Sequence, residues 1–237
     1  MLESNLTLTE ALIDPILDRD PAGPRVTWYD DATGARIELS GLTLANWAAK
    51  TANLIRDEFA LTPGARVAVL LPAHWQTAAV LLGAWWAGTE VVLQPDPDAE
   101  LAFVTPDRLD DVDGVAEVAV LSLDAMGTPV RDVPPGVTDF ASAVRVHGDQ
   151  FRPGGVGAAL DGIGVADVLA AARKSASTQG ISAGDRVMSS GEWGSVDELV
   201  GGLISVLAVG GSLVQVANPD PAAADRRVEA ERVTVRR

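Results

Sequence analysis

The sequence contains no cysteine and only two histidines in 237 residues. The absence of cysteine excludes disulfide bonds and thiolate chemistry. Structural zinc sites are built from clustered Cys and His ligands, so two isolated histidines do not predict one. We therefore expect no metal site and assign no catalytic residue from these two residue types.

Basic residues are also scarce. The chain has 18 Lys and Arg against 33 Asp and Glu, so its formal net charge is 18 − 33 = −15. Such an acidic surface repels phosphate backbones, and we expect no nucleic-acid partner. A C-terminal group of arginines departs from this balance: Arg226, Arg227, Arg232, Arg236 and Arg237. Such a group can form a phosphate patch, but a solvated helix face followed by a strand is more common, and we expect the latter.

Long uninterrupted hydrophobic runs are missing as well. Glu90 interrupts the apolar stretch 78–93, and the stretch 199–214 contains four glycines. Both fall short of the ~18–20 apolar residues that a membrane span requires. The segment from Met1 to Asp20 has no basic region before an apolar stretch, unlike a secretory signal. These features predict no membrane association and a cytoplasmic protein.

Apolar residues make up 47% of the chain, which is enough to bury a substantial core. Residues 1–24 predict a leader helix and a loop. β-Branched and aromatic residues on both sides of a Gly-bearing turn predict a hairpin over residues 25–39. Ser40 is a suitable N-cap for a helix with apolar residues from Leu44 to Ile55 at spacings of three and four.

The next stretches alternate between short apolar strands and apolar helices. Strands are predicted at Arg66–Leu71 and Glu90–Leu93, with a helix at Trp75–Trp86 between them. Continuous rather than alternating apolarity is typical of parallel strands covered on both faces. A further strand is predicted at Val115–Leu121. The Pro- and Asp-rich residues 94–113 are expected to be mostly loop, and residues 127–164 to be a connector.

The same order of elements then occurs a second time. The sequence Ala183–Val187 is similar to Pro63–Val67, an offset of 183 − 63 = 120 residues. Gly210–Val216 is similar to Ala87–Leu93, an offset of 210 − 87 = 123. An internal duplication and ordinary α/β recurrence both account for this similarity. Either one favours parallel strands joined by right-handed helical crossovers.

Three stretches of the first half carry a resemblance to a known superfamily. They are Leu61–Pro72 (LTPGARVAVLLP), Ala78–Gly88, and Glu90–Pro97 (EVVLQPDP). Together they resemble the N-terminal part of the adenylate-forming, or AMP-binding, enzymes. These include the acyl-CoA synthetases, the adenylation domains of peptide synthetases and the luciferases. The resemblance implies an α/β fold of two packed parallel-sheet βα units flanked by helices, as in the N-terminal part of acyl-CoA synthetases.

The resemblance extends over residues 25–237, because it resumes at Gly184–Val187, 199–211 and 229–235. It implies four segments: residues 1–24 as leader helix and loop, 25–150 as a first α/β unit, 151–164 as a Gly-rich connector, and 165–237 as a second, incomplete α/β unit. The sequence departs from the superfamily in the connector, where a Ser/Thr/Gly-rich phosphate loop ending in Lys is required. Gly154–Gly164 has no Ser, Thr or Lys, so we expect a flexible linker there. The superfamily's C-terminal domain with its catalytic Lys is also missing, so we expect a truncated form.

A candidate ligand site follows from the predicted topology. In doubly wound sheets, ligands bind at the carboxyl ends of the strands. The side chains expected there, which could stack on a planar ligand or else fill the core, are His74, Trp75, Gln94, Asp96, Ser189 and Trp193. Of these, Trp193 resembles the superfamily's aromatic residue facing the substrate channel.

Two non-catalytic functions are consistent with a missing phosphate loop. One is a binding module for a nucleotide, acyl or CoA-like ligand, with ATP, AMP or CoA as its adenine ligands. The other is an interaction module that forms a homodimer or binds a protein partner through an apolar patch. A third hypothesis keeps residual activity as an AMP-forming acid ligase, or uses Ser182 or Ser190 as a nucleophile, although no base is positioned by sequence to activate either serine. We expect a pseudoenzyme, with no catalytic residue and no metal.

Overall fold

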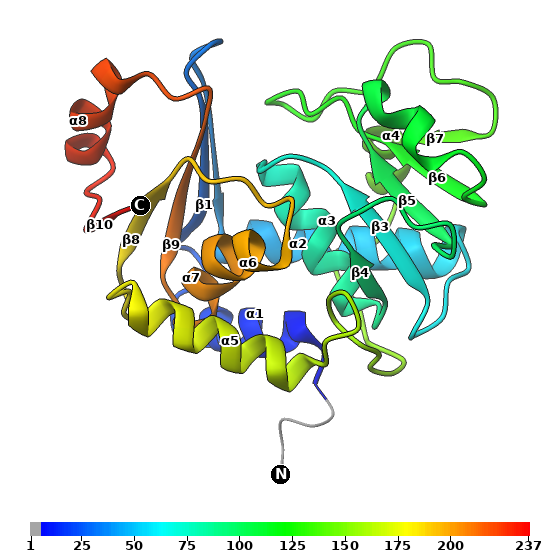
Figure 1. The fold of residues 1–237 in the computed structure, drawn as a ribbon, viewed down its shortest axis with the longest axis horizontal. Helices are drawn as coiled ribbons and strands as arrows, with labels where there is room; N and C mark the ends of the chain where they lie inside the picture. Colours follow the sequence, from blue (N-terminus) through cyan, green and yellow to red (C-terminus); the bar gives the residue numbers. More distant parts are fainter. Residues whose placement is uncertain (1–5) are drawn as a thin grey trace.

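The computed structural model describes residues 6–237 and contains two five-stranded sheets (Figure 1). Sheet A has the strand order β10 (Val235–Arg236), β8 (Arg186–Ser189), β9 (Ser212–Ala217), β1 (Pro24–Asp30) and β2 (Ala35–Ser40). Sheet B has the order β4 (Glu90–Val92), β3 (Arg66–Leu70), β5 (Leu101–Val104), β6 (Glu117–Val120) and β7 (Val137–Asp139). Neighbouring strands pair in parallel in both sheets, except the antiparallel hairpin β1–β2. The expected α/β fold of two parallel-sheet units is confirmed.

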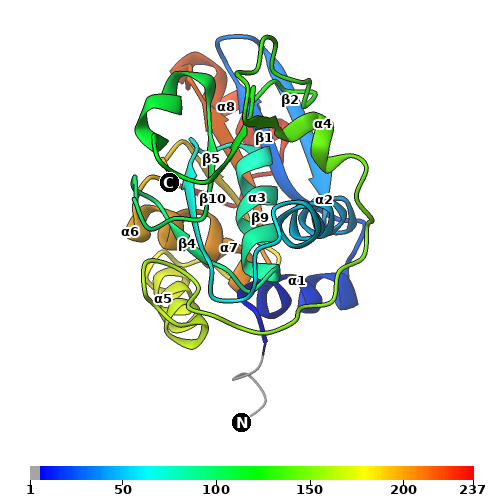
Figure 2. The same ribbon diagram turned by 90° about the vertical axis from the view of Figure 1, so that its right-hand side faces the viewer.

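Helices fill the space between the sheets and cover their lower edge in Figure 1. The longer ones are α1 (Leu8–Arg19), α2 (Gly41–Asn53), α3 (Trp75–Trp86), α5 (Val165–Thr178) and α8 (Pro221–Ala230). Shorter segments are α4 (Phe140–Val144), α6 (Val196–Leu199), α7 (Ser205–Ala208), the 3₁₀ helix η3 (Pro106–Val112), and the π-helical segments η2 (Leu54–Glu58) and η4 (Val200–Ile204). Figure 2 shows α1 and α5 lying together at that edge, with α2 and α3 above them.

Local sequence signals account for where the helices begin. Ser40 Oγ accepts a hydrogen bond from the Thr43 N–H at 3.1 Å, so the predicted N-cap of α2 is confirmed. At α1, Thr7 and Glu10 form a reciprocal capping box, which satisfies backbone donors that the first helical turn leaves free. The leader helix is therefore confirmed at Leu8–Arg19, while residues 1–5 lie outside the described part of the chain.

One continuous hydrophobic core extends from sheet A through α2 and α3 to sheet B. Its members include Trp28 of β1, Leu82 of α3 and Phe103 of β5, all nearly inaccessible to solvent. A second, smaller cluster covers the opposite face of sheet B and includes Leu70 and Val104. The continuous core fixes the two sheets relative to each other, which positions the strand ends discussed below.

The contact between α2 and α3 depends on a glycine. A Cβ atom added at Gly83 would lie 2.4 Å from Thr51 Cβ and 3.0 Å from the carbonyl oxygen of Ala48. The two helices can therefore approach this closely only because residue 83 has no side chain.

We expect Gly83→Ala to lower the free energy of unfolding by about 1–2 kcal/mol. Overpacking a tight core typically costs about 1–3 kcal/mol, which exceeds the roughly 0.5–1 kcal/mol that Ala gains over Gly in a helix. Urea unfolding followed by tryptophan fluorescence measures the change. Gly148→Ala is the control, because its nearest new contact would be Asn53 Nδ2 at 3.9 Å. Equal stability of the two variants would contradict the close packing of α2 against α3 at Gly83.

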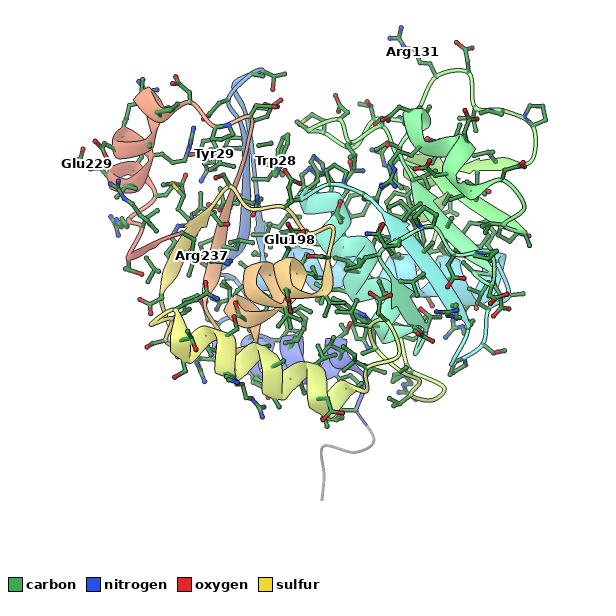
Figure 3. The ribbon with its side chains drawn as sticks, viewed as in Figure 1. Trp28, Tyr29, Arg131, Glu198, Glu229 and Arg237 are labelled. Carbon is green, nitrogen blue, oxygen red and sulfur yellow. The ribbon has the colours of Figure 1, made fainter. Side chains whose placement is uncertain are left out.

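The outer face of sheet A carries a polar network instead of a hydrophobic layer. Glu231, which follows α8, accepts hydrogen bonds from Tyr29 Oη at 2.5 Å and Arg36 Nε at 2.9 Å, and pairs with Arg186. Trp28 and Tyr29 lie on opposite sides of β1, with Tyr29 toward α8 (Figure 3). Burial works to raise the pKa of Glu231, but the hydrogen bonds from Arg36, Tyr29 and Arg186 outweigh it and lower the pKa to about 2.

Several sequence predictions need correction. Residues 94–113 are not mostly loop, because they contain β5 (Leu101–Val104), which is fully buried in the middle of sheet B, and the 3₁₀ helix η3 (Pro106–Val112). The expected connector 127–164 contains an edge strand, β7, and the short helix α4. Part of the Gly-rich tract is also packed rather than free: Ala159 O accepts a hydrogen bond from Trp85 Nε1 at 2.8 Å, and Leu160 forms a β-bridge with Val91. A flexible linker is therefore wrong for this part.

The two parts of the chain that have similar sequences, 63–93 and 183–216, adopt matching local structures. Glu90 N donates to Ala65 O at 2.8 Å at the start of β4, and Ser212 N donates to Asp185 O at 2.9 Å at the start of β9. In each case a turn, a strand, an apolar helix and a second parallel strand follow one another. This correspondence is consistent with a duplication and with ordinary α/β recurrence, so the choice stays open.

The sheets do not follow the predicted segment boundaries in a simple way. The hairpin β1–β2 was placed in the first unit, 25–150, yet β1 pairs with β9 of the second. Whether the boundaries at residues 24, 150 and 164 separate folding units stays a prediction. No helix within residues 6–237 combines the length and apolarity needed to cross a membrane.

Candidate functional site

An open cavity of about 350 Å³ lies at the carboxyl ends of strands from both sheets, which we call the carboxyl-edge cavity. Its walls come from β1 and β9 of sheet A, and from the loops that follow β3, β6 and β8. The lining residues with polar side chains are Trp28, Asp30, His74, Ser190, Glu192, Gln215 and Asn218. This is the edge at which the sequence predicts ligand binding, and the volume is in the usual range of small-molecule sites.

His74 lies between β3 and α3 and is 2% exposed. Its Nδ1 accepts a hydrogen bond from the Gln76 N–H at 3.1 Å, which caps α3. Burial lowers the pKa of His74 to about 3, against the smaller opposing effects of Asp124 and Asp30. The ring is therefore neutral at pH 7, and with Nδ1 as acceptor its proton is on Nε2. That N–H has no partner in the described structure.

Two further side chains of the cavity have unpartnered polar atoms. Trp28 is 6% exposed, its ring meets the His74 ring edge-on at 4.3 Å, and its Nε1–H has no acceptor among the described residues. Gln215 is 2% exposed, and its Nε2 donates to Gly191 O at 2.9 Å, while its Oε1 has no donor within the described residues. Buried polar atoms without partners are uncommon, because each costs about 1–3 kcal/mol. Trp28, His74 and Gln215 all line the cavity, so two N–H donors and one acceptor without partners lie just beneath its surface.

The charged side chains that line the cavity are acidic. Asp30 and Glu192 line the cavity, whereas the lining residues identified within 6–237 include no Lys or Arg. Burial works to raise the pKa of Asp30, but hydrogen bonds from Asn218, Thr33 and the Ala32 N–H outweigh it and lower the pKa. The Asp30 carboxylate is therefore ionised and occupied by protein donors. A triphosphate placed here would meet two carboxylates and no cation among these residues.

A second hollow of about 450 Å³ adjoins the cavity at the carboxyl end of sheet B. It shares Pro72 and Glu192 with the carboxyl-edge cavity, and Arg108 is its basic residue. Arg108 is paired with Asp111 at 2.8 Å. The two hollows together give a ligand room to extend from sheet A to sheet B.

The predicted site residues lie in different places. His74 lines the cavity, and Ser189 is buried next to it, where its Oγ accepts from Gly191 N at 3.1 Å. Trp75 is in the core, with its Nε1 donating to Ala125 O at 3.1 Å. Trp193 is buried against η4, since a Cβ added at Gly202 would lie 3.0 Å from its Nε1.

The two remaining candidates make contacts outside the cavity lining. Gln94 Nε2 donates to Gly194 O at 2.9 Å, and Asp96 forms an ion pair with Arg66 at 2.7 Å. Gln94 therefore ties the end of β4 to the loop after β8, and Asp96 is held near the start of β3. A ligand-binding role for Trp75, Gln94, Asp96, Ser189 and Trp193 stays a prediction, and this cavity does not support it.

Sequence reasoning missed Trp28 and Gln215, which lie inside strands rather than after them. One signal was available for Gln215. It is a polar residue with apolar neighbours on both sides in the strand SLVQVA, and it is buried. A polar residue in a buried strand needs a partner, so it marks either a network or a ligand site.

Serine chemistry does not follow from the geometry. Ser190 lines the cavity with His74, but the proton on His74 Nε2 leaves that atom no lone pair to accept the serine proton. Ser182 lies in the turn before β8, where its backbone N–H donates to Asp185 Oδ2 at 2.7 Å. A nucleophile elbow requires the turn after a strand, so this serine is in the wrong position. Within residues 6–237, no group of three or more His, Asp or Glu side chains is arranged to hold a metal ion.

Comparison of sequences identifies a relative of this chain. A Mycobacterium tuberculosis (strain ATCC 25618 / H37Rv) protein described as "TIGR03089 family protein" is 56% identical over 236 residues, covering 96% of this chain and 97% of the relative. No known family model matches the chain.

Solved structures of ligases share the fold at low identity. An acyl-CoA synthetase of Brucella canis matches with a TM-score of 0.79 at 17% identity, covering 98% of this chain and 47% of that one. A benzoate CoA ligase from Burkholderia xenovorans LB400 matches with a TM-score of 0.74 at 18% identity, covering 98% and 50%. The anthranilate CoA ligase AuaEII, solved with anthranoyl-AMP, matches with a TM-score of 0.75 at 13% identity, covering 98% and 49%. The chain thus has the fold of the N-terminal part of acyl-CoA synthetases and spans about half the length of these ligases.

Proposed function

The chain belongs to the family of the "TIGR03089 family protein" of Mycobacterium tuberculosis, and we propose that it binds a planar or acyl small molecule in the carboxyl-edge cavity without adenylating it. The observation that carries the proposal is the set of unpartnered polar atoms in one cavity: Trp28 Nε1, His74 Nε2 and Gln215 Oε1. A ligand that pairs with them removes an energetic cost that the ligand-free protein carries. This gives binding energy without requiring any catalytic group.

The donors and the acceptor define the chemistry of the ligand. It carries an oxygen or ring nitrogen that accepts from the Trp28 or His74 N–H, and an N–H or O–H that donates to Gln215 Oε1. A planar ring suits the cavity because Trp28 and His74 supply aromatic surface. An adenine ring and an aminobenzoate both satisfy this description. In a nucleotide or CoA-like ligand, the ring or acyl end occupies the cavity and the phosphates lie outside it, because the lining is acidic.

Three observations support binding without ATP-dependent ligation. The Gly-rich tract has no Lys or Ser/Thr, the cavity lining supplies no cation within the described residues, and His74 is unsuited to accept a proton. An AMP-forming acid ligase needs positive groups on the transferring phosphate. Steady release of pyrophosphate from ATP in the presence of a carboxylic acid, such as benzoate or anthranilate, would overturn the non-catalytic part of the proposal.

The alternative of an interaction module has less support in the structure. Among residues 6–237, the exposed large hydrophobic side chains lie on separate segments: Leu6, Leu42, Met126, Val146 and Val156. Scattered apolar side chains of this kind are normal for a protein surface. A homodimer or a protein partner stays a prediction, which light scattering at several concentrations tests.

We expect anthranilate to raise the melting temperature of the protein more than benzoate does at equal concentration. The two molecules differ by one amino group, which can donate to Gln215 Oε1. In Gln215→Leu this advantage should disappear, with about a tenfold weaker anthranilate affinity for one lost hydrogen bond. Gln94→Leu is the matched control, because Gln94 lies outside the cavity lining.

A wider panel tests the ligand class. Adenine, AMP, ATP, CoA and acyl-CoA are added in the same thermal-shift assay, in which a ligand at ~100 times its dissociation constant adds ~2.7 kcal/mol of stability. A shift with adenine or AMP identifies a nucleotide ring as ligand. The absence of any shift across the panel, with Gln215→Leu indistinguishable from the wild type, would contradict the proposal.

A further inference from the structure

A separate hollow of about 490 Å³ lies at the amino ends of the parallel strands of sheet A, and we call it the amino-edge hollow. Its lining includes residues at or near the starts of β1, β8, β9 and β10. Parallel strands point from this edge toward the carboxyl-edge cavity, so the two spaces lie at opposite edges of the same sheet. None of the residues that line one space lines the other.

Four arginines from four separate segments line the amino-edge hollow. They are Arg19 at the end of α1, Arg25 in β1, Arg186 in β8, and Arg232 after α8. The acidic residue of the lining is Asp20. In a protein with a net charge of −15, this hollow thus has an excess of basic over acidic lining residues, and a concave site with such an excess attracts anions.

Two of the four arginines are already paired. Arg25 Nη2 lies 3.1 Å from Asp20 Oδ2, and Arg186 pairs with Glu231 behind the hollow. The side chains of Arg19 and Arg232, by contrast, make no hydrogen bond or ion pair with any residue in 6–237, and both residues are exposed. The paired arginines give the hollow a fixed wall, and the other two guanidinium groups are available to an anion.

The backbone at Arg232 adopts a conformation that is uncommon for arginine. Arg232 has φ +52°, in the left-handed region, and directly follows the C-cap of α8. The Val233 N–H donates to Val228 O at 2.9 Å, so the helix ends in a Schellman motif whose left-handed position is usually glycine. An arginine there is less favourable than glycine, and strained backbone of this kind clusters at functional sites.

We propose that the amino-edge hollow binds a phosphate-bearing small molecule through Arg19 and Arg232, with Arg25 and Arg186 forming the wall. Planar guanidinium groups bind phosphate oxygens in pairs, which suits a doubly charged anion between two of them. The hollow is larger than one phosphate ion, so a diphosphate fits the chemistry better than a monovalent anion. This site is independent of the function proposed for the carboxyl-edge cavity.

The test uses inorganic pyrophosphate, inorganic phosphate and sodium chloride at matched ionic strength, in a thermal-shift assay and by isothermal titration calorimetry. We expect a saturable rise in the melting temperature with pyrophosphate, a smaller rise with phosphate, and none with sodium chloride. ADP is the third probe. Binding of ADP equal to that of pyrophosphate assigns the site to the phosphates alone, and tighter binding of ADP adds the nucleoside to the ligand.

Variants separate a ligand site from a structural role. Arg232→Gly should raise the melting temperature of the ligand-free protein, because the strain is relieved, and weaken pyrophosphate binding at least tenfold. Arg19→Gln should also weaken binding. The control is Arg226→Gln, which removes the same charge from an exposed position on α8 outside the hollow. Gln215→Leu should leave pyrophosphate binding unchanged, which keeps this test separate from that of the carboxyl-edge cavity.

Two outcomes overturn the proposal. One is pyrophosphate binding that is absent, or that Arg226→Gln weakens as much as Arg232→Gly does. The other is a loss of ligand-free stability in both Arg19→Gln and Arg232→Gly without an effect on binding. That result would mean that these arginines serve the negative carboxyl ends of α1 and α8.

Discussion

Acidification from pH 7 to pH 4 is expected to destabilise the folded protein by about 3 kcal/mol through His74 alone. Burial lowers the pKa of this imidazole from 6.5 to about 3 in the folded state. Below pH 6.5 the unfolded chain binds a proton at His74 that the folded protein does not bind, so unfolding becomes easier. The gap of about 2.5 pH units between 6.5 and 4 corresponds to about 3 kcal/mol. The effect is absent above pH 6.5 and stops growing below about pH 3.

The variant His74→Asn isolates this effect. An asparagine oxygen can accept the Gln76 N–H in place of Nδ1, so the cap of α3 is retained while the titrating group is removed. Urea unfolding at pH 7, 6, 5 and 4 gives the free energy of unfolding of both proteins. The stability of the wild type relative to the variant should fall by about 3 kcal/mol over this range. Carboxylates titrate in both proteins, and their contribution cancels in the difference.

His147→Asn is the matched control, because it removes the second histidine, whose ring lies 3.2 Å from Glu58 rather than in the cavity. If the wild type and His74→Asn lose stability in parallel from pH 7 to pH 4, the buried neutral histidine is contradicted. Because burial keeps the ring neutral down to about pH 3, protonation of His74 should not change ligand binding in the carboxyl-edge cavity between pH 7 and pH 4.

Local sequence signals predicted most of the elements, since they depend on residues close together in the chain. The N-cap at Ser40 and the apolar run at β3 are examples. The strand β5 was missed because its four apolar residues, Leu101–Val104, lie in a stretch rich in Pro and Asp. Its burial comes from its neighbours β3 and β6, which local patterns do not specify.

Long-range pairing also decided how much of the site could be predicted. The rule for parallel sheets pointed to the edge at which the carboxyl-edge cavity lies, and to His74, which lines that cavity. It could not show that β1 joins β9, and that pairing brings Trp28 to the cavity beside Gln215. Trp75 and Trp193 were expected near a ligand because they follow strand ends. Both are buried in the core, the alternative that the sequence left open, since large aromatic side chains also fill gaps between helices and sheets.

Glu231→Gln is expected to lower the free energy of unfolding by about 3 kcal/mol at pH 7. The Glu231 side chain is only 6% exposed, and that of its partner Arg186 is 13% exposed. Removing one member of a buried ion pair leaves the other charge without compensation, which costs about 3–5 kcal/mol. We expect the lower end of this energy range, because Arg36, which also pairs with Glu231, is 42% exposed and can be hydrated.

The pH dependence of the same variant gives an independent check. Hydrogen bonds lower the pKa of Glu231 from 4.5 to about 2 in the folded state, in spite of burial. This group therefore stabilises the protein above pH 4.5, and the contribution is lost as the pH falls toward 2. The gap of about 2.5 units corresponds to about 3 kcal/mol, in agreement with the ion-pair argument. The difference in stability between wild type and Glu231→Gln should narrow between pH 4.5 and 2. His74 changes the stability between about pH 6.5 and 3, so most of its effect occurs at higher pH.

The control for this prediction is Glu229→Gln, which removes the same charge from an exposed position of α8, seen at the edge of the molecule in Figure 3. Surface changes of this kind usually alter stability by less than about 0.5 kcal/mol. Since Tyr29 and Arg36 hold Glu231 from sheet A, its loss should release α8 and β10 first. Hydrogen exchange should then show faster exchange in residues 221–237 of Glu231→Gln than in the core of sheet B. Equal stability of the Glu229 and Glu231 variants would mean that the network does not hold α8 against sheet A.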